Sequence, residues 1–288
     1  MASEAARAKR PPRTSVWLEG KPPGRSRKPD PTGRPDATGD ISGASGDSGV
    51  SGASGESCDA DHPSGLDRLR ITAVSVRLLD AEGLAKFSMR RLAGELGVTA
   101  MSLYWYVDTK DDLLEMALDS VFGEIRVPDL TDENADWRDQ LRELAVSYRT
   151  VLVRHAWISP LIGQYLNIGP RSMHFSSAVQ AVMRRTGLAP SHQKGAFSAV
   201  FQFVYGFGTI EGHYVQRCAE AEVSQDEYYR HAMGSISEKP EFQGSFHQET
   251  GESAEAGGGD TVEEMRERDF TFALELLIAG IEAMRARE

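Results

Sequence analysis

The chain of 288 residues contains only two cysteines and no long apolar run. Cys58 lies in a Gly/Ser-rich tract and Cys218 in a helical segment, so no disulfide framework is predicted and a reducing compartment is expected. Residues 1–28 lack the apolar centre of a signal peptide. The apolar run 270–284 contains two glutamates and is too short to span a bilayer. We therefore expect a cytoplasmic protein with no membrane partner.

An excess of positive charge is also missing, because 32 Lys and Arg are outnumbered by 43 Asp and Glu, which gives a formal net charge of −11. This balance excludes a histone-like protein that coats DNA irrespective of sequence. Residues 84–110 are an exception, since four basic side chains there face only two acidic ones. One locally positive region on an acidic protein is suited to specific contact with DNA.

Signs of enzyme chemistry are absent as well. The sequence has no evident nucleophile–base pair, no glycine loop for phosphate and no carboxylate cluster with a defined partner. His155, His174 and His213 have no convincing metal-ligand spacing, and a lone helical histidine is usually a structural residue. We predict neither an enzyme nor a bound metal or cofactor.

Residues 1–65 are rich in Gly, Ser, Pro and Asp, with near-repeats such as SGASGDSGVSGASGES, so we expect them to be disordered. The island Ser15–Leu18 and the basic residues that follow it interrupt this pattern. Two interpretations stay open: a basic solvated tail, or an arm that places Arg25, Arg27 and Lys28 in the DNA minor groove. A Gly/Ser tether separates this arm from the folded part, so contact would cost ordering entropy.

The stretch Phe87–Leu114, FSMRRLAGELGVTAMSLYWYVDTKDDLL, is typical of a helix-turn-helix. Ser88 can cap a first helix whose apolar side chains recur at i, i+3, i+4 and i+7, and Gly97 suits its end. Thr99 can cap the second helix, which in this motif enters the major groove of DNA.

No strand-like alternation is present, so an all-α fold is predicted. A helix that ends at Gly83 should precede the motif, and another should start at Thr109, with two aspartates in its first turn. Further helices are expected over 137–152, 175–186, about 191–222 and 262–287, and a loop over 223–261. Three glycines inside the 191–222 helix would each cost roughly 1 kcal/mol relative to Ala, which is acceptable where another helix packs closely.

Over about residues 66–288 this pattern resembles the tetracycline-repressor (TetR) family of bacterial regulators, most closely at Leu84–Leu114 with its LYW and K-x-x-LL. The resemblance implies an N-terminal three-helix helix-turn-helix DNA-binding domain at 66–126. It also implies a larger C-terminal helical ligand-binding and dimerisation domain at 127–288. A homodimer would form through the helices near 191–222 and 262–287.

The same resemblance implies nine DNA contacts. The hydroxyl and cations that open the first helix would meet phosphate, and the first residues of the second helix would face base edges. Two tyrosines and the last lysine would hold the DNA backbone. These residues are Ser88, Arg90, Arg91, Ala100, Met101, Ser102, Tyr104, Tyr106 and Lys110. Tyr106 stays open between phosphate contact and packing, whereas Trp105, Leu103 and Val107 are expected to pack inside.

The implied function is a repressor that a small, aromatic organic inducer releases from a palindromic DNA operator. Alternatives are a TetR-like activator, or a helical small-molecule-binding protein with a vestigial DNA head. Candidate pocket residues mix aromatic walls with polar groups: Trp157, Gln164, Tyr165, Phe201, Tyr205 and Glu211. The metal-binding histidine of tetracycline repressors is missing, since its expected position falls near Ile162, so a tetracycline–magnesium complex is not expected as the ligand.

Overall fold

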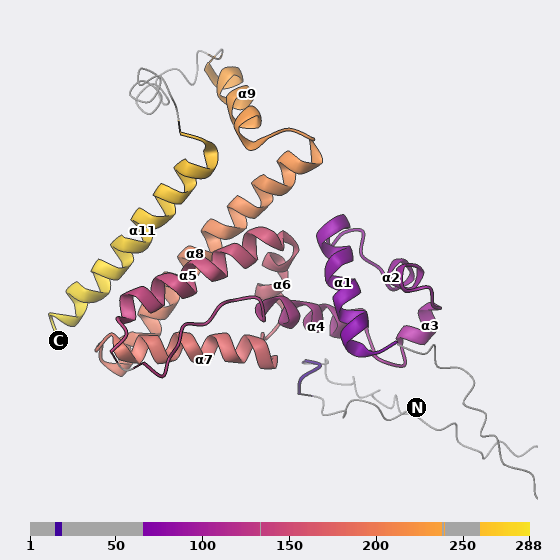
Figure 1. Ribbon diagram of the computed structural model, residues 1–288, viewed down its shortest axis with the longest axis horizontal. Helices are drawn as coiled ribbons and strands as arrows, with labels where there is room; N and C mark the ends of the chain where they lie inside the picture. The colour runs from indigo at the N-terminus through magenta and orange to yellow at the C-terminus, as the bar shows by residue number, and fades with distance from the viewer. Residues whose placement is uncertain (1–14, 19–65, 133, 238, 240–259) are drawn as a thin grey trace, which may run out of the picture.

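A computed structural model of the chain describes residues 15–18, 66–132, 134–237, 239 and 260–288 (Figure 1). These residues form helices and no strand, as predicted. The helices are α1 (Arg68–Glu82), α2 (Met89–Leu96), α3 (Ala100–Leu103), α4 (Lys110–Phe122), α5 (Trp137–Arg154), η1 (Ala156–Ile158), α6 (Ser159–Gln164), α7 (Pro170–Arg185), α8 (Pro190–Glu220), α9 (Gln225–Ser237) and α11 (Val262–Arg285). We call α1 to α4 the head and α5 to α11 the core.

The head is built on short-range signals that the sequence displays. Ser88 Oγ accepts a hydrogen bond from the Arg91 N–H at 3.2 Å and so caps α2. Two glycines end helices in backbone conformations with positive φ, which favour glycine: Gly83 at +76° and Gly97 at +69°. The predicted ends of α1 and α2 and the predicted cap of α2 are therefore confirmed.

Helix α4 connects the head to the core, because it packs against α1 on one side and against α6 and α7 on the other. Its apolar residues are buried. Three carboxylates are buried as well, and each accepts backbone N–H groups from a different segment. Asp112 binds the turn before α4, Glu115 binds Val16 and Asp119 binds the start of α7. These bonds satisfy the buried charges, which would otherwise be costly.

Helices α5 and α8 make the most extensive contact in the core. Gly208 and Gly212 of α8 lie directly against α5. A Cβ atom at Gly212 would be 3.0 Å from the carbonyl oxygen of Leu152, and one at Gly208 would be 3.0 Å from Leu152 Cβ. The prediction that glycines permit close helix packing is confirmed at these two positions, whereas Gly206 has no such neighbour.

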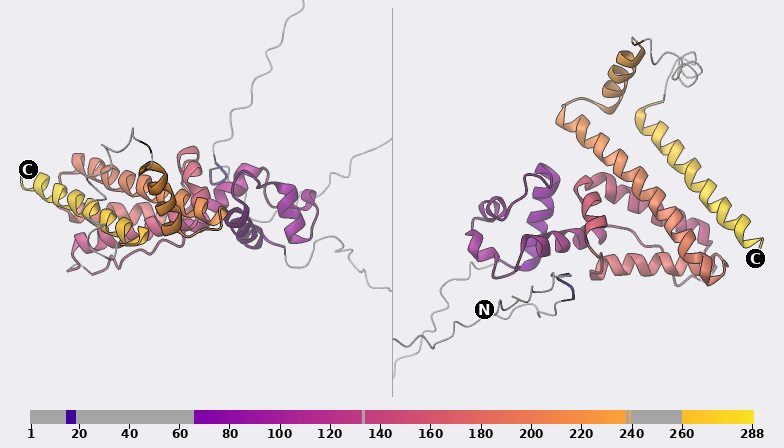
Figure 2. Two further views of the ribbon diagram at one scale, coloured as in Figure 1. Left: turned by 90° about the horizontal axis from the view of Figure 1, so that it is seen from above. Right: turned by 180° about the vertical axis from the view of Figure 1, so that it is seen from behind.

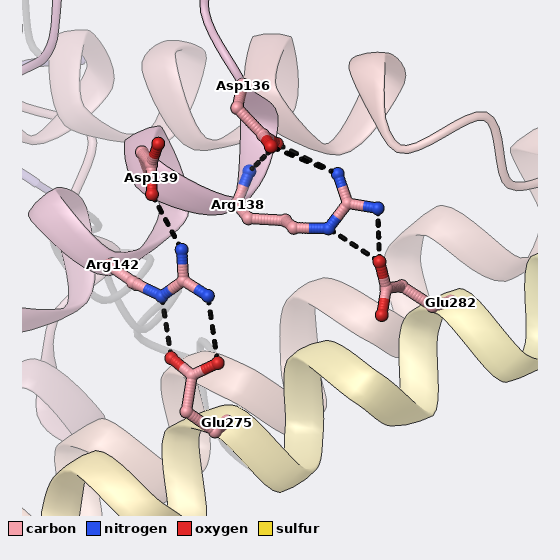
Figure 3. Close-up of polar contacts among 6 residues, drawn as sticks. All are labelled: Asp136, Arg138, Asp139, Arg142, Glu275 and Glu282. Carbon is pink, nitrogen blue, oxygen red and sulfur yellow. Dashed lines mark hydrogen bonds and ion pairs between the residues drawn. The ribbon is translucent and has the colours of Figure 1, made fainter.

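Within the core, ion pairs join helix α11 to α5 (Figure 3). Arg142 binds Glu275 through two bonds, of 2.6 and 2.8 Å, and Arg138 binds Glu282. One face of α11 is buried, from Phe270 to Ile281. Figures 1 and 2 show the head at one end of the molecule and α11 along the far side of the core.

Some predicted boundaries are wrong. The segment 223–261 is not all loop, because α9 occupies Gln225–Ser237 and packs on α8 and α11. Its many polar residues give no clear apolar periodicity, so the sequence did not indicate this helix. Helix α7 begins at Pro170 rather than at 175, since proline is well tolerated in a first helical turn. The predicted disorder of residues 1–65 is not tested, because only Ser15–Leu18 of this region is described. Arg25, Arg27 and Lys28 lie outside the described residues.

Candidate DNA-binding surface and helical core

The helix-turn-helix places a very short second helix beside α2. Thr99 caps α3 by accepting from the Ser102 N–H, and the Thr99 and Ser102 hydroxyls lie 2.9 Å apart. Leu103 and Val107 are fully buried, which confirms their predicted packing role. They fix α3 to the head, so the remaining side chains of this segment face outward or sit at its edge.

Three large side chains around α3 are exposed: Met101 at 71%, Tyr104 at 43% and Trp105 at 64%. The prediction that Trp105 packs inside is wrong. Helix α3 ends at Leu103, and residues 104–106 continue as a turn, so the spacing that would bury Trp105 on a longer helix does not apply. Trp105 is therefore a surface residue of the candidate site that sequence reasoning missed.

Tyr106 is half-buried and packs against the buried apolar residues of the head. Its carbonyl oxygen accepts a hydrogen bond from Arg68 Nε at 2.8 Å, which ties the turn after α3 to α1. Ala100 also packs against these buried residues and is half-buried. These two predicted contact residues thus have structural partners inside the head.

The basic side chains of the head differ in whether they already bind other groups of the protein. Arg90 is exposed and makes no ion pair within the described part of the chain. Arg91 instead binds Glu82 at 2.6 Å and Glu95 at 3.0 Å. Lys110 donates to the carbonyl oxygen of Phe87 at 2.8 Å and lies over the Phe87 ring. The start of α4 is therefore held beside the start of α2.

A polar cluster around the buried His155 joins the head to the core. The His155 ring nitrogens lie 2.6 Å from an Asp80 oxygen of α1 and 3.2 Å from a Glu124 oxygen after α4. Trp157 Nε1 donates to the same Asp80 oxygen, and Arg154 also binds Glu124. Burial lowers the pKa of His155, but hydrogen bonds to the two carboxylates outweigh it, so the net pKa is raised.

The six predicted pocket residues differ in their burial and in their hydrogen-bond partners. Phe201 is buried, whereas Gln164 is exposed at the end of α6. The others are tied to protein partners: Trp157 to Asp80, Tyr165 to Asp111, Tyr205 to the Ser159 carbonyl and Glu211 to Arg149. Burial and the Asp111 charge raise the pKa of Tyr165, so its hydroxyl stays protonated and donates.

An aromatic cluster lies between α4, α5, α7 and α8, and sequence reasoning found only part of it. Phe201 contacts Phe175 and Phe197 at ring-centre distances of 5.5 and 5.3 Å, and Tyr148 at 6.0 Å. Tyr148 is buried, which raises its pKa, and its hydroxyl has no hydrogen-bond partner among the described residues. Only contacts between distant segments reveal this cluster, because each aromatic alone resembles ordinary core.

Ile162, near which the metal-binding histidine of tetracycline repressors would fall, packs against the buried apolar residues. Within the described ranges, no group of three or more His, Cys, Asp or Glu side chains is placed to hold a metal ion. No described helix is both long and apolar enough to cross a membrane.

The short recognition helix α3 with its capped start, presented by the head on a separate helical core, defines a helix-turn-helix DNA-binding regulator. Two family models match the chain: "Bacterial regulatory proteins, tetR family" over residues 71–117, and "Tetracyclin repressor-like, C-terminal domain" over residues 128–285. The chain belongs to the TetR family, whose members are transcriptional regulators rather than enzymes.

Relatives agree with this assignment. An HTH-type transcriptional regulator of Saccharopolyspora erythraea is 31% identical over 76% of this chain and 86% of its own. The transcriptional repressor DrrR1 of Streptomyces coeruleorubidus is 29% identical over 76% of this chain and 78% of its own. The structure of the Streptomyces coelicolor TetR family protein ActR in complex with actinorhodin is 26% identical, with a TM-score of 0.58, and covers 76% of this chain and 97% of that one.

Proposed function

We propose that this regulator is a cytoplasmic repressor that binds a palindromic operator as a homodimer and is released by a small aromatic ligand. Residues 66–126 would form its DNA-binding domain, and residues 127–288 would bind the ligand and dimerise. The exposed, capped α3 with a basic surround carries the DNA part of this proposal. The names of its relatives, a repressor and a protein that binds actinorhodin, support the rest.

For DNA contact we propose the nine residues predicted from the sequence and add Trp105. Met101 and Ser102 would face base edges, and Tyr104 would reach a phosphate beside them. Arg90 is well placed for phosphate, because it is exposed and no carboxylate of the described residues pairs with it. Lys110 would contribute its remaining N–H donors, since one already binds Phe87. The arm formed by Arg25, Arg27 and Lys28 would add minor-groove contacts.

The DNA test uses a duplex that the wild-type protein selects from a randomised library. We expect a palindromic sequence to emerge and Tyr104→Ala and Lys110→Ala to weaken its binding. Arg90→Ala should weaken binding and lower the salt slope by about 1, the value for one phosphate contact. Arg91→Ala is the matched control with a smaller expected loss, because Glu82 and Glu95 already neutralise Arg91. Unchanged affinity in the Tyr104 and Lys110 variants would contradict the contact assignment.

The proposed dimer uses the outer faces of α8 and α11. Large apolar side chains are exposed there, with Ile210 at 73%, Phe272 at 67% and Leu276 at 58%. Exposed apolar side chains grouped on one face are typical of an interface. Sedimentation of the wild-type protein should give a dimer, and Phe272→Glu together with Leu276→Glu should give monomers that retain helical circular dichroism.

For the ligand we propose the aromatic cluster of Phe201, Tyr148 and Phe175, together with Tyr205 one turn after Phe201 on α8. The unpartnered Tyr148 hydroxyl is a polar group inside an apolar wall, which is a common arrangement in ligand sites. The probe is a panel of aromatic, antibiotic-like compounds, with actinorhodin first. A bound compound should raise the unfolding temperature of the wild-type protein, and Tyr148→Phe should reduce that rise. A broad panel without any stabilising compound would contradict ligand sensing.

A further inference from the structure

The N-terminal region contacts the folded protein at a defined site. Ser15 Oγ donates to Glu115 Oε2 at 2.5 Å, and the Val16 N–H donates to the same oxygen at 3.2 Å. The segment closes on itself, because the Leu18 N–H donates to the Ser15 carbonyl at 3.2 Å and the Trp17 N–H donates to Ser15 Oγ. Ser15 is 1% exposed and Glu115 is 8% exposed. This is a buried, specific attachment.

The position of Glu115 makes the attachment relevant to the head. Glu115 lies one turn after Asp112, which fixes the turn that follows α3. On the same helix, Asp111 accepts from Tyr165 of the core. The attached segment therefore lies on the helix that connects the DNA-binding surface to the core, on the side seen below α4 in Figure 1.

We propose that Ser15–Leu18 is an intramolecular docking segment, that Glu115 is its receptor, and that docking holds the basic residues that follow close to the DNA. This rests on the proposed DNA-binding function and deepens it. In the sequence, Arg25 is seven residues beyond Leu18 but 41 residues before Leu66. The composition of the Gly/Ser tract alone predicted a long and costly tether. Docking at Glu115 replaces that tether with one of about seven residues.

The gain follows from tether length. The effective concentration of a tethered group falls roughly as the −3/2 power of the length of its tether. Shortening the tether of Arg25 from 41 to seven residues would therefore raise its effective concentration at the DNA roughly tenfold. Contacts between Lys or Arg and phosphate depend on charge rather than base sequence, so any duplex reports this gain.

The first test measures docking itself. Hydrogen exchange followed by mass spectrometry on the full chain should show slow exchange in the peptide that contains the Val16 amide. Glu115→Gln should reduce that protection, because an amide oxygen is a weaker acceptor than a carboxylate. Ser15→Ala/Val16→Pro should abolish the protection of the Trp17 and Leu18 amides in the same peptide, since the proline itself has no N–H, and Ser48→Ala/Val50→Pro is the matched control in the same region. A wild-type peptide that exchanges freely would overturn the docking.

The second test measures DNA affinity with a mixed-sequence 30-bp duplex at several salt concentrations. Ser15→Ala/Val16→Pro should weaken binding roughly tenfold and reduce the salt slope, with no change in net charge. Glu115→Gln should also weaken binding, although removing a negative charge alone would favour DNA. When Arg25, Arg27 and Lys28 are already alanine, neither variant should cause a further loss.

The outcomes separate the two proposals. If the wild-type protein binds the duplex but the docking variants bind equally well, the docking role is wrong and the DNA-binding proposal stands. The docking role is also wrong if the loss of affinity persists without the three basic residues. If the wild-type protein binds no duplex even at low salt, the DNA-binding proposal and the inference that rests on it both fail.

Discussion

The head and the core differ in the sequence separation of the contacts that stabilise each of them. In the head, the bonds that start helices join residues three positions apart, as between Ser88 and Arg91 or Thr109 and Asp112. In the core, Arg149 binds Glu211 and Glu267, which are 62 and 118 residues away in the chain. Local signals thus specify the head, and distant partners specify the core.

This difference explains why one half of the function is easier to read than the other. DNA contact depends on a few consecutive residues whose caps and glycines appear in order along the chain. A ligand pocket instead depends on which side chains from several helices meet. Its chemistry emerges only when those helices are packed.

The largest expected effect tests the long-range contacts of the core. Arg149 and Glu211 are 9% and 12% exposed, and the Arg149 guanidinium also lies over the Phe207 and Phe270 rings. Arg149→Ala should lower the free energy of unfolding by about 3–5 kcal/mol, because it leaves a buried carboxylate unpaired. The measurement is urea unfolding at fixed protein concentration.

The control for this variant is Arg142→Ala. The Arg142–Glu275 pair is largely open to solvent, so its loss should cost no more than about 1 kcal/mol. Equal and small effects for the two arginines would show that long-range ion pairs do not organise the core.

A smaller effect is expected in the head. Thr109 and Asp112 form a capping box at the start of α4, with both bonds at 3.0 Å. Thr109→Ala should lower the free energy of unfolding by about 1 kcal/mol, because the N-terminal N–H groups of α4 lose an acceptor. Thr109→Ser should restore most of it, and Thr150→Ala, in the middle of α5, is the control. A loss as large as that of Arg149→Ala would erase the contrast between head and core.

The smallest expected effect lies at the junction and depends on pH. The raised pKa of His155 means that the folded state holds its proton more tightly than the unfolded state. The resulting stabilisation is complete below the ordinary value of 6.5 and is lost as pH rises through the folded-state pKa. Urea unfolding midpoints should therefore fall as the pH rises above about 6.5.

Two variants assign this pH dependence. His155→Asn should remove it, because Asp80 and Glu124 then face a side chain that does not titrate. His174→Asn alters an exposed histidine and should leave it unchanged. A wild-type profile that is flat over this range would contradict the protonated junction.

The sequence alone predicted the all-α fold, the capped helix-turn-helix and the glycine-dependent packing of α8. It misplaced Trp105, because periodicity cannot reveal that α3 stops after Leu103. It also missed α9, whose polar composition resembles a loop until Tyr214 and Asp226 connect it to α8 and α11. The sequence did not indicate Tyr148 as a pocket residue, because its aromatic neighbours come from other helices.

Helix α4 has a consequence for how such a protein can diverge. Asp112 and Asp119 accept hydrogen bonds from main-chain N–H groups, of residues 108–109 and 171–172. Every amino acid except proline offers that group, so these partners can be substituted widely without breaking the link. The residues that must be retained to keep this connection are then the aspartates of α4 and Gly169, where a Cβ atom would lie 2.2 Å from Asp119 Oδ1. Substitutions in the head that change the operator, and substitutions in the core that change the ligand, can therefore accumulate while α4 keeps the two parts connected.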